Sequence, residues 1–209
     1  MNNSATAQGQ LWVIAAPSGA GKTSLVNALV KKVENLLISI SYTTRAPRPS
    51  EQDGVNYFFI SEQQFKQMIS AEDLLEYANV FGNYYGTGRT WVSEQLKAGI
   101  DVILEIDWQG AAQIRELMPD SHSIFILPPS LEVLETRLHG RGEDKPEVIQ
   151  KRLAEASLEM SHCDEFDYIV INDQFEQALA ELEIIITAQR LISERQMQRY
   201  GHLIKNLQQ

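Results

Sequence analysis

The sequence predicts an α/β fold in which a parallel sheet forms the core, and two observations carry that prediction. An apolar run at residues 11–16 ends in a glycine-containing turn, and residues 22–33 then place apolar side chains at helical spacing. The same alternation of strand-like and helix-like segments returns after residue 100. Strands that alternate with helices form parallel sheets covered by helices on both faces, so we expect three layers.

The elements after residue 100 follow in a regular order. Strands are predicted at 102–106, 123–127 and 168–171, and helices at 108–117, at 130–138 and over 175–200, the last as one long helix or two joined helices. Pro128 and Pro129 end the second of these strands, and Ser130 is a candidate N-cap for the helix that follows.

Two segments interrupt this alternation. Residues 38–89 contain strand-like runs at 38–43, 57–60 and 74–81 around a helix that begins near Ser61, which predicts a small mixed-sheet insertion. Residues 139–146 form a polar, charged loop before a helix that carries Arg152, as suits a moving lid. The predicted units are a core of residues 1–37, 90–130 and 153–209, the insertion 38–89 and a lid over 131–152.

Composition narrows the functions that the chain can have. Its 209 residues, 44% of them hydrophobic, suffice for one buried core, and the net charge of −10 disfavours nucleic acid or an anionic membrane as a partner. The single cysteine, Cys163, excludes an internal disulfide and fits a reducing compartment. No stretch approaches the roughly 20 apolar residues of a membrane span, and residues 1–10 lack a basic signal-peptide start. We therefore expect a soluble, cytoplasmic protein.

Residues 16–23 match the phosphate-binding pattern G-x-x-x-x-G-K-[ST], with Ala16 in place of the first glycine. In such a P-loop, backbone amides and a helix N-terminus face the phosphates, a lysine reaches the outer phosphates and a hydroxyl contacts Mg²⁺. Because the segment follows a predicted strand and opens a predicted helix, it indicates a nucleoside triphosphate site. The predicted contacts are Ala16, Pro17, Ser18, Gly19, Ala20, Gly21, Lys22 and Thr23, with Thr23 beside the metal ion.

Asp107 follows the predicted strand 102–106, where P-loop enzymes keep a carboxylate that supports the metal ion through water. The same residue suits the N-cap of the next helix, and both interpretations stay open. Residues 107–110 also spell D-x-x-G, a pattern found in GTPases, but the chain contains no N-K-x-D guanine motif. A GTPase is therefore the weaker hypothesis.

Two groups of arginines are candidates for binding anionic ligands. Arg45 and Arg48 lie in a proline-rich segment, and about three residues per turn in a polyproline-like backbone points both guanidinium groups the same way, as a fork for phosphate. Arg137, Arg141 and Arg152 surround the predicted lid loop. An exposed loop and a solvated helix face are the alternatives for the two groups.

Six segments, in order along the chain, resemble motifs of the guanylate kinase family, and of its stand-alone bacterial members in particular. They are residues 16–24, 41–48 (S-Y-T-T-R-A-P-R), 81–86 (F-G-N-Y-Y-G), 106–110 (I-D-W-Q-G), 140–142 (G-R-G) and 171–173 (I-N-D). The resemblance runs from about residue 10 to the C-terminus, with a kinase-like unit over about 10–190. It implies a P-loop fold that transfers the terminal phosphoryl group of ATP to GMP, and to dGMP, with Mg²⁺, in purine nucleotide recycling.

The resemblance also implies roles for single residues. The GMP phosphate would contact Arg45, Arg48, Tyr57 and Tyr85, and guanine would face Ser41, Glu76, Thr87 and Asp107. A carboxylate at Glu76 can accept hydrogen bonds from guanine N1–H and the amino group beside it, which adenine cannot supply. Ordinary packing of the tyrosines and a solvated strand position for Glu76 are the alternatives. Asn172 would lie near adenine, while the catalytic set would be Lys22, Arg137, Arg141 and Arg152, with no general base.

Two other functions remain as rival hypotheses: a related interaction domain that binds phosphopeptides, and a kinase for another nucleotide. Intact Lys22 and Thr23 disfavour the first, and Glu76 disfavours the second. The expected partners are ATP and GMP, with no nucleic acid and no membrane. Exposed apolar positions in the predicted C-terminal helices are candidates for a homo-oligomer interface.

Overall fold

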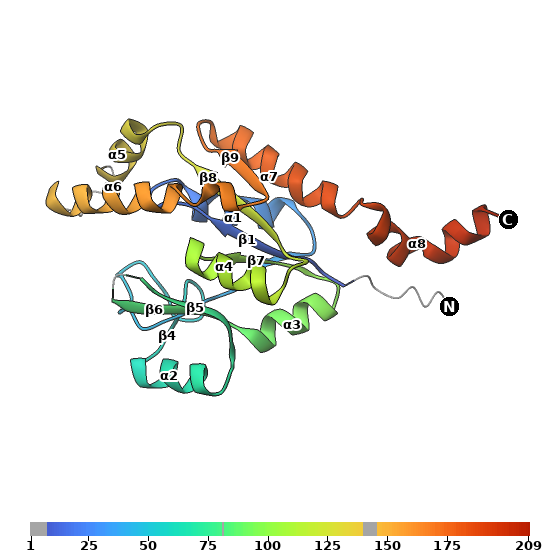
Figure 1. The fold of residues 1–209 in the computed structure, drawn as a ribbon, viewed down its shortest axis with the longest axis horizontal. Helices are drawn as coiled ribbons and strands as arrows, with labels where there is room; N and C mark the ends of the chain where they lie inside the picture. Colours follow the sequence, from blue (N-terminus) through green and yellow to red (C-terminus); the bar gives the residue numbers. More distant parts are fainter. Residues whose placement is uncertain (1–7, 81, 140–145) are drawn as a thin grey trace.

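A five-stranded parallel sheet forms the centre of the computed structural model, which describes residues 8–80, 82–139 and 146–209. The strands lie in the order β2-β7-β1-β8-β9 (Figure 1). Their bounds are Leu11–Ala15 for β1, Leu36–Ile38 for β2, Asp101–Glu105 for β7, His122–Leu127 for β8 and Tyr168–Ile171 for β9. The predicted α/β fold with a parallel core is confirmed.

Helices cover both faces of this sheet, and the side chains of β1 belong to the hydrophobic clusters on both faces. Trp12 and Ile14 join a buried cluster with α1 (Lys22–Lys32) and α7 (Phe175–Gln189). Leu11 and Val13 pack instead with residues of α3 (Arg89–Lys97) and α4 (Trp108–Leu117). Because successive side chains of a strand point to opposite faces, the apolar run of β1 suits a strand buried on both sides.

A second, four-stranded sheet of order β4-β3-β6-β5 lies below the core sheet in Figure 1. Its strands are β3 (Tyr42–Thr43), β4 (Phe58–Phe59), β5 (Leu74–Val80) and β6 (Asn83–Gly88). β3 pairs in parallel with β4 and antiparallel with β6, so the predicted mixed sheet is confirmed. The helix α2 (Glu62–Ser70) begins after Ser61, whose hydroxyl accepts a hydrogen bond from the Gln64 amide in a capping box.

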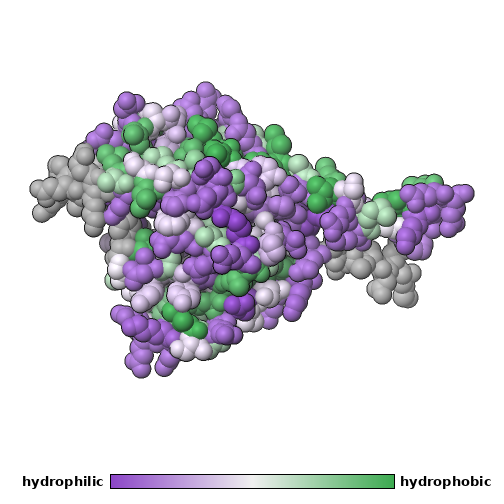
Figure 2. Space-filling model, in the orientation of Figure 1, coloured by the Kyte–Doolittle hydropathy of each residue, from purple (hydrophilic) through white to green (hydrophobic). Residues whose placement is uncertain are grey.

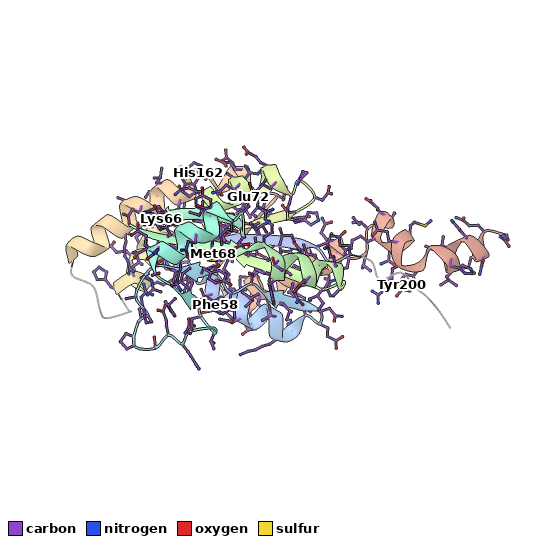
Figure 3. The ribbon with its side chains drawn as sticks, turned by 90° about the horizontal axis from the view of Figure 1, so that it is seen from below. Phe58, Lys66, Met68, Glu72, His162 and Tyr200 are labelled. Carbon is purple, nitrogen blue, oxygen red and sulfur yellow. The ribbon has the colours of Figure 1, made fainter. Side chains whose placement is uncertain are left out.

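Further helices complete the described part of the chain. They are α5 (Leu131–His139), α6 (Pro146–Met160), the short helix η1 (Cys163–Glu165) and α8 (Ser193–Leu207). The Ser130 hydroxyl accepts a hydrogen bond from the Val133 amide, so the predicted cap of α5 is present. In Figures 1 and 3, α8 extends away from the body of the molecule with Tyr200 on it, and Figure 2 shows apolar and polar side chains together on that helix. Within the described ranges, no helix is long and apolar enough to cross a membrane.

Two segments differ from the sequence prediction, and in a third the structure shows which of the two predicted alternatives is formed. Residues 38–43, predicted as one strand, divide between β2 and β3, which belong to different sheets, and Ser39 and Ser41 are buried at this crossing. Neither β6 nor α3 is predicted, because the glycines at 86 and 88 are more typical of turns than of strands. The segment 175–200 forms two helices, with the break after Gln189.

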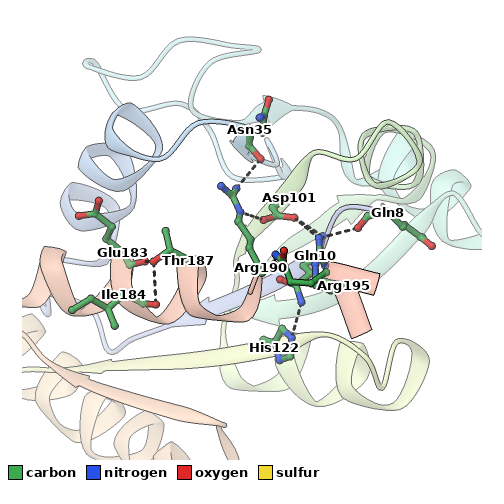
Figure 4. A network of polar contacts seen from close by, with 11 residues as sticks. Gln8, Gln10, Asn35, Asp101, His122, Glu183, Ile184, Thr187, Arg190 and Arg195 are labelled. Carbon is green, nitrogen blue, oxygen red and sulfur yellow. Dashed lines mark hydrogen bonds and ion pairs between the residues drawn. The ribbon is translucent and has the colours of Figure 1, made fainter. Parts of the chain in front are cut away.

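A buried carboxylate, that of Asp101, binds side chains at the junction between α7 and α8 (Figure 4). Asp101 accepts hydrogen bonds from the Gln10 amide at 2.6 Å and from Arg190 Nε at 2.8 Å, and Arg195 Nη2 lies 3.7 Å from it. Arg195 also donates to the carbonyl of Gln8 at 3.0 Å. The starts of β1 and β7 are thereby joined to the C-terminal helices.

Replacing Asp101 with alanine should lower the free energy of unfolding by about 3 kcal/mol, because two arginines and the Gln10 amide lose a common acceptor. In a chain of this length the melting temperature should fall by roughly 10 °C. Chemical and thermal denaturation measure both quantities, with Asp120→Ala at an exposed position as the control. Equal melting temperatures for the two variants would show that the Asp101 contacts contribute little.

Candidate functional site

A cavity of about 810 Å³ lies where the P-loop, the second sheet and α6 face one another. In open α/β sheets, ligands bind beyond the carboxyl ends of the parallel strands, where β1 here leads into the P-loop and β7 into Asp107. Most of the predicted site residues line this cavity. They are Ala16, Pro17, Ser18, Gly19, Gly21, Lys22, Thr23, Ser41, Arg45, Arg48, Tyr57, Glu76, Tyr85, Asp107 and Arg152.

The P-loop turns sharply from β1 into α1. Gly19 and Gly21 both have φ of 92°, a left-handed conformation that favours glycine, and Gly21 is the N-cap of α1 without a side-chain cap bond. Lys22 Nζ donates to the carbonyl of Ile106 at 3.2 Å, which directs the lysine toward the end of β7. The loop therefore presents amides and one cation to the cavity, as a phosphate requires.

The hydroxyl of Thr23 donates to Glu105 Oε2 at 3.0 Å. Glu105 is the last residue of β7 and lines the cavity, and the sequence reasoning overlooked it in favour of Asp107. A hydroxyl and one carboxylate beside a phosphate site suit Mg²⁺, which takes few protein ligands and completes its shell with phosphates and water. In the part of the chain that the structure describes, no group of three or more His, Cys, Asp or Glu side chains forms a separate metal site.

Asp107 occupies the N-cap of α4. Its Oδ1 accepts a hydrogen bond from the Gly110 amide at 2.8 Å, while the side chain also lines the cavity. The N-cap interpretation is therefore correct, and a cavity role stays compatible with it.

Glu76 on β5 is a buried carboxylate that faces the cavity. Only 3% of its surface is exposed, and Thr87 on β6 donates to its Oε1 at 2.7 Å. Burial, with a smaller contribution from the nearby charge of Asp107, raises the pKa of Glu76 to about 7, although Thr87 and Lys22 act to lower it. A solvated strand position is excluded for Glu76, and a carboxylate held this way is poised to take hydrogen bonds from a ligand.

The glycine of the D-x-x-G pattern has a role in holding this carboxylate. A Cβ atom at Gly110 would come within 2.6 Å of Glu76 Oε2 and 3.2 Å of Ile106 Cδ1. The first turn of α4 therefore needs a glycine where it passes Glu76, independently of any GTPase function.

For GMP and ATP, the substrates that the sequence resemblance implies, Gly110→Ala should raise the KM for GMP at least tenfold and leave the KM for ATP unchanged, because the added methyl group displaces Glu76. Alanine favours helix by about 1 kcal/mol over glycine, so a weaker helix would not explain the loss. Steady-state kinetics measure both constants, and Gly201→Ala in α8, where nothing lies within 4 Å of the added Cβ, is the matched control. An unchanged KM for GMP would show that Glu76 does not need this space.

Arg45 is held in place before any phosphate arrives. Its Nη2 lies 2.8 Å from Glu51 Oε1, its Nε donates to the hydroxyl of Tyr85 at 3.2 Å, and its guanidinium lies 5.6 Å from the Tyr57 ring centre. The hydrogen bond with Arg45 lowers the pKa of Glu51, and the same bond raises the pKa of Arg45. Glu51 also accepts from the Arg48 amide, and the sequence reasoning missed it although it lies three residues after Arg48.

Four predicted residues do not line the cavity: Ala20, Thr87, Arg137 and Asn172. Thr87 is fully buried behind Glu76. Asn172 donates to the carbonyl of Ala20 at 2.7 Å, and Arg137 Nη2 donates to the carbonyl of Asn172 at 3.0 Å. These contacts support the P-loop from behind, and Arg137 Nη1 is buried with no acceptor in the described part of the chain.

Some predicted residues cannot be placed, and others were not foreseen. Arg141, the G-R-G segment at 140–142 and Phe81 lie outside the described residues. On α6, Glu155 and Glu159 line the cavity beside Arg152, and neither carboxylate was predicted, although Arg152 of the same helix was.

Known proteins resemble this chain in sequence and in fold. The guanylate kinase family model matches residues 8–189. The guanylate kinase of Hahella chejuensis is 60% identical over 185 residues, which cover 88% of this chain and 89% of that protein. Those of Alcanivorax borkumensis and Escherichia coli K12 are 58% and 54% identical over 96% of this chain and 97% and 98% of their own lengths. The crystal structure of guanylate kinase from Anaplasma phagocytophilum superposes with a TM-score of 0.77 at 33% identity, covering 91% of this chain and 90% of that one.

Proposed function

Because the chain belongs to the guanylate kinase family and is an ATP:GMP phosphotransferase, we propose that its cavity binds ATP on the P-loop and GMP on the second sheet. The observation that carries this proposal is the buried Glu76, which faces the same cavity as Lys22. One cavity therefore offers two groups. Its carboxylate can accept hydrogen bonds from a base with two adjacent donors, and its lysine can bind phosphates.

On the GMP side, we assign the base to Glu76, Ser41, Thr87 and Asp107. Glu76 would accept from guanine N1–H and the 2-amino group, while Thr87 holds the carboxylate from behind. The hydroxyl of Ser41, which lines the cavity, would donate to an acceptor on the base, and Asp107 is close enough to raise the pKa of Glu76. Adenine would leave the buried carboxylate without donors, so AMP should be rejected.

The GMP phosphate would lie on Arg45, Arg48, Tyr57 and Tyr85. Glu51 fixes the guanidinium of Arg45 through Nη2, and Tyr85 accepts from its Nε. A prearranged arginine loses little conformational freedom when it binds phosphate. These contacts address the base and the phosphate of the acceptor, so we extend the proposal to dGMP.

On the ATP side, residues 16–23 would hold the phosphates, with Lys22 at the outer ones. Asn172 and Arg137 support the loop, and a phosphate oxygen would satisfy the buried Nη1 of Arg137. Thr23 and Glu105 would hold Mg²⁺ together with the phosphates of ATP, where the ion neutralises charge when bound. Asp107 is a candidate to support it through water.

Catalysis would rest on position and charge. The two phosphates meet between Lys22 and the lid arginines, and water exclusion strengthens every charge interaction there. We assign Lys22, Arg137, Arg141 and Arg152 to this role and no residue to general base catalysis. Residues 131–152 would act as the lid, 38–89 as the GMP-binding subdomain, and 1–37, 90–130 and 153–209 as the core. The same proposal places the enzyme in the cytoplasm, in purine nucleotide recycling.

An assay of ADP release from ATP and Mg²⁺ tests this function, with GMP, dGMP, AMP, UMP or dTMP as acceptor. We expect turnover with GMP and dGMP, and a kcat/KM for AMP lower by on the order of 10⁴-fold. Equal turnover of AMP and GMP would overturn the assignment of Glu76. No turnover with any acceptor would overturn the enzyme assignment itself.

A further inference from the structure

The lid helices already rest on the P-loop in this structure. Leu134 and Leu138 of α5 form a buried cluster with Ala156 of α6, and a Cβ atom at Gly19 would lie 3.1 Å and 3.0 Å from these two leucines. Figure 1 shows α5 and α6 as neighbours. Just after the C-terminal end of α6, the ring of His162 stacks on Trp108 with 3.7 Å between centroids and 6° between planes. α6 is thus fixed against the core on both sides of residue 159.

Glu159 lies between these two anchors and faces the cavity. Its carboxylate shares the cavity lining with Ser18 and Lys22, and the Ser18 backbone amide and the charge of Lys22 favour its charged form. Burial, together with the charges of Asp107 and Glu155, raises the pKa of Glu159 to about 7 against these two groups. An anion is therefore held where the P-loop offers its own anion-binding groups.

The groups that hold Glu159 are groups that a triphosphate also needs. A P-loop lysine reaches the outer phosphates of the nucleotide, and the loop amides bind phosphate oxygens. A carboxylate that lines the same cavity as this loop and its lysine would repel a terminal phosphate and compete for both donors. ADP lacks the third phosphate and would meet less of this competition.

We propose that Glu159 is a positioning residue that takes the place of the terminal phosphate of ATP at the P-loop of the nucleotide-free protein and is displaced when ATP binds. Displacement of Glu159 removes one interaction of α6 with the P-loop, and α6 carries Arg152, so donor binding is coupled to a lid arginine through this one side chain. This inference rests on the proposed function, because it takes residues 16–23 to be the ATP site.

Equilibrium binding of ATP and of ADP to the full chain, with Mg²⁺ and without GMP, tests the proposal. In Glu159→Gln the affinity for ATP should rise five- to tenfold, while the affinity for ADP should change less than twofold. The KM for ATP should fall similarly and the KM for GMP should not move. Glu94→Gln, which removes the same charge from an exposed position on α3, should leave all four constants unchanged.

The possible outcomes are distinct. Equal gains for ATP and ADP, or weaker ATP binding in Glu159→Gln, would overturn the inference and leave the proposed function intact. Wild-type protein that binds neither nucleotide would overturn both. Glu159→Ala, with its folding checked by thermal denaturation, should change ATP binding in the same direction as Glu159→Gln, and an opposite change would also contradict the proposal.

Discussion

Replacing Glu76 with glutamine should lower kcat/KM for GMP by on the order of 10³-fold and should raise the melting temperature at pH 8. The loss follows from the chemistry of guanine, whose adjacent N1–H and amino group both donate. A carboxylate can accept both hydrogen bonds, whereas an amide places its own NH₂ donor against one of them. Sites built on such pairs discriminate by several orders of magnitude when a partner is wrong.

The gain in stability follows from the pKa of Glu76. The folded protein raises this pKa from 4.5 to about 7, so the native state binds the proton more tightly than the unfolded chain does. Stability must then fall as pH rises from about 4.5 to about 7, and remain lower above that range, by up to about 3 kcal/mol. Glutamine removes this cost but buries an extra amide donor, so the net gain should be 1 to 3 kcal/mol, roughly 2 to 10 °C at pH 8. At pH 5 the gain should shrink, because wild-type Glu76 is then protonated.

Thermal denaturation at both pH values and steady-state kinetics with GMP measure these effects. Glu62→Gln is the matched control, since it removes a carboxylate that is 61% exposed from the same subdomain. A variant that loses activity together with stability at pH 8 would show that Glu76 is structural. A variant that keeps its kcat/KM for GMP would show that guanine binds elsewhere.

Lys22→Ala should reduce kcat by on the order of 10³-fold while the melting temperature changes by only a few degrees. The lysine side chain makes one hydrogen bond in the described part of the chain, at 3.2 Å to the Ile106 carbonyl, and it is only half-buried. Its charge matters most when negative charge shifts between the two nucleotides, where no other cation of the P-loop can replace it.

Single-turnover kinetics with ATP and GMP separate this loss of chemistry from weaker binding. Lys31→Ala, near the exposed end of the same helix, is the control and should keep its kcat. Near wild-type turnover in Lys22→Ala would refute its catalytic role. Arg141→Ala is expected to act in the same direction as Lys22→Ala.

Local patterns predicted the parts of the site that are local in sequence. The P-loop needs eight consecutive residues, and the strand and helix around it have their own periodicity, so Lys22 and Thr23 could be assigned directly. The arginine fork was also visible, because Arg45 and Arg48 share one extended segment. The parallel core followed from the alternation of elements.

The missed features depend on contacts between distant segments. Glu159 meets Ser18 only because the α5–α6 pair packs onto Gly19, and no spacing in the sequence encodes that approach. Gly110 looked like half of a GTPase pattern until Glu76, on another sheet, was found against it. Asn172 was assigned to adenine, which stays a prediction, while its hydrogen bond to the Ala20 carbonyl behind the loop was not foreseen.

The contact between Arg195 and the Gln8 carbonyl has a consequence for the connectivity of the chain. Gln8 precedes β1 and Arg195 lies in the first turn of α8, so the start of the first strand and the start of the last helix meet beside Asp101. A circular permutant whose linker runs back along α8 to this point, and whose chain opens at the exposed Pro119 and Asp120, should preserve the architecture, since neither residue lines the cavity.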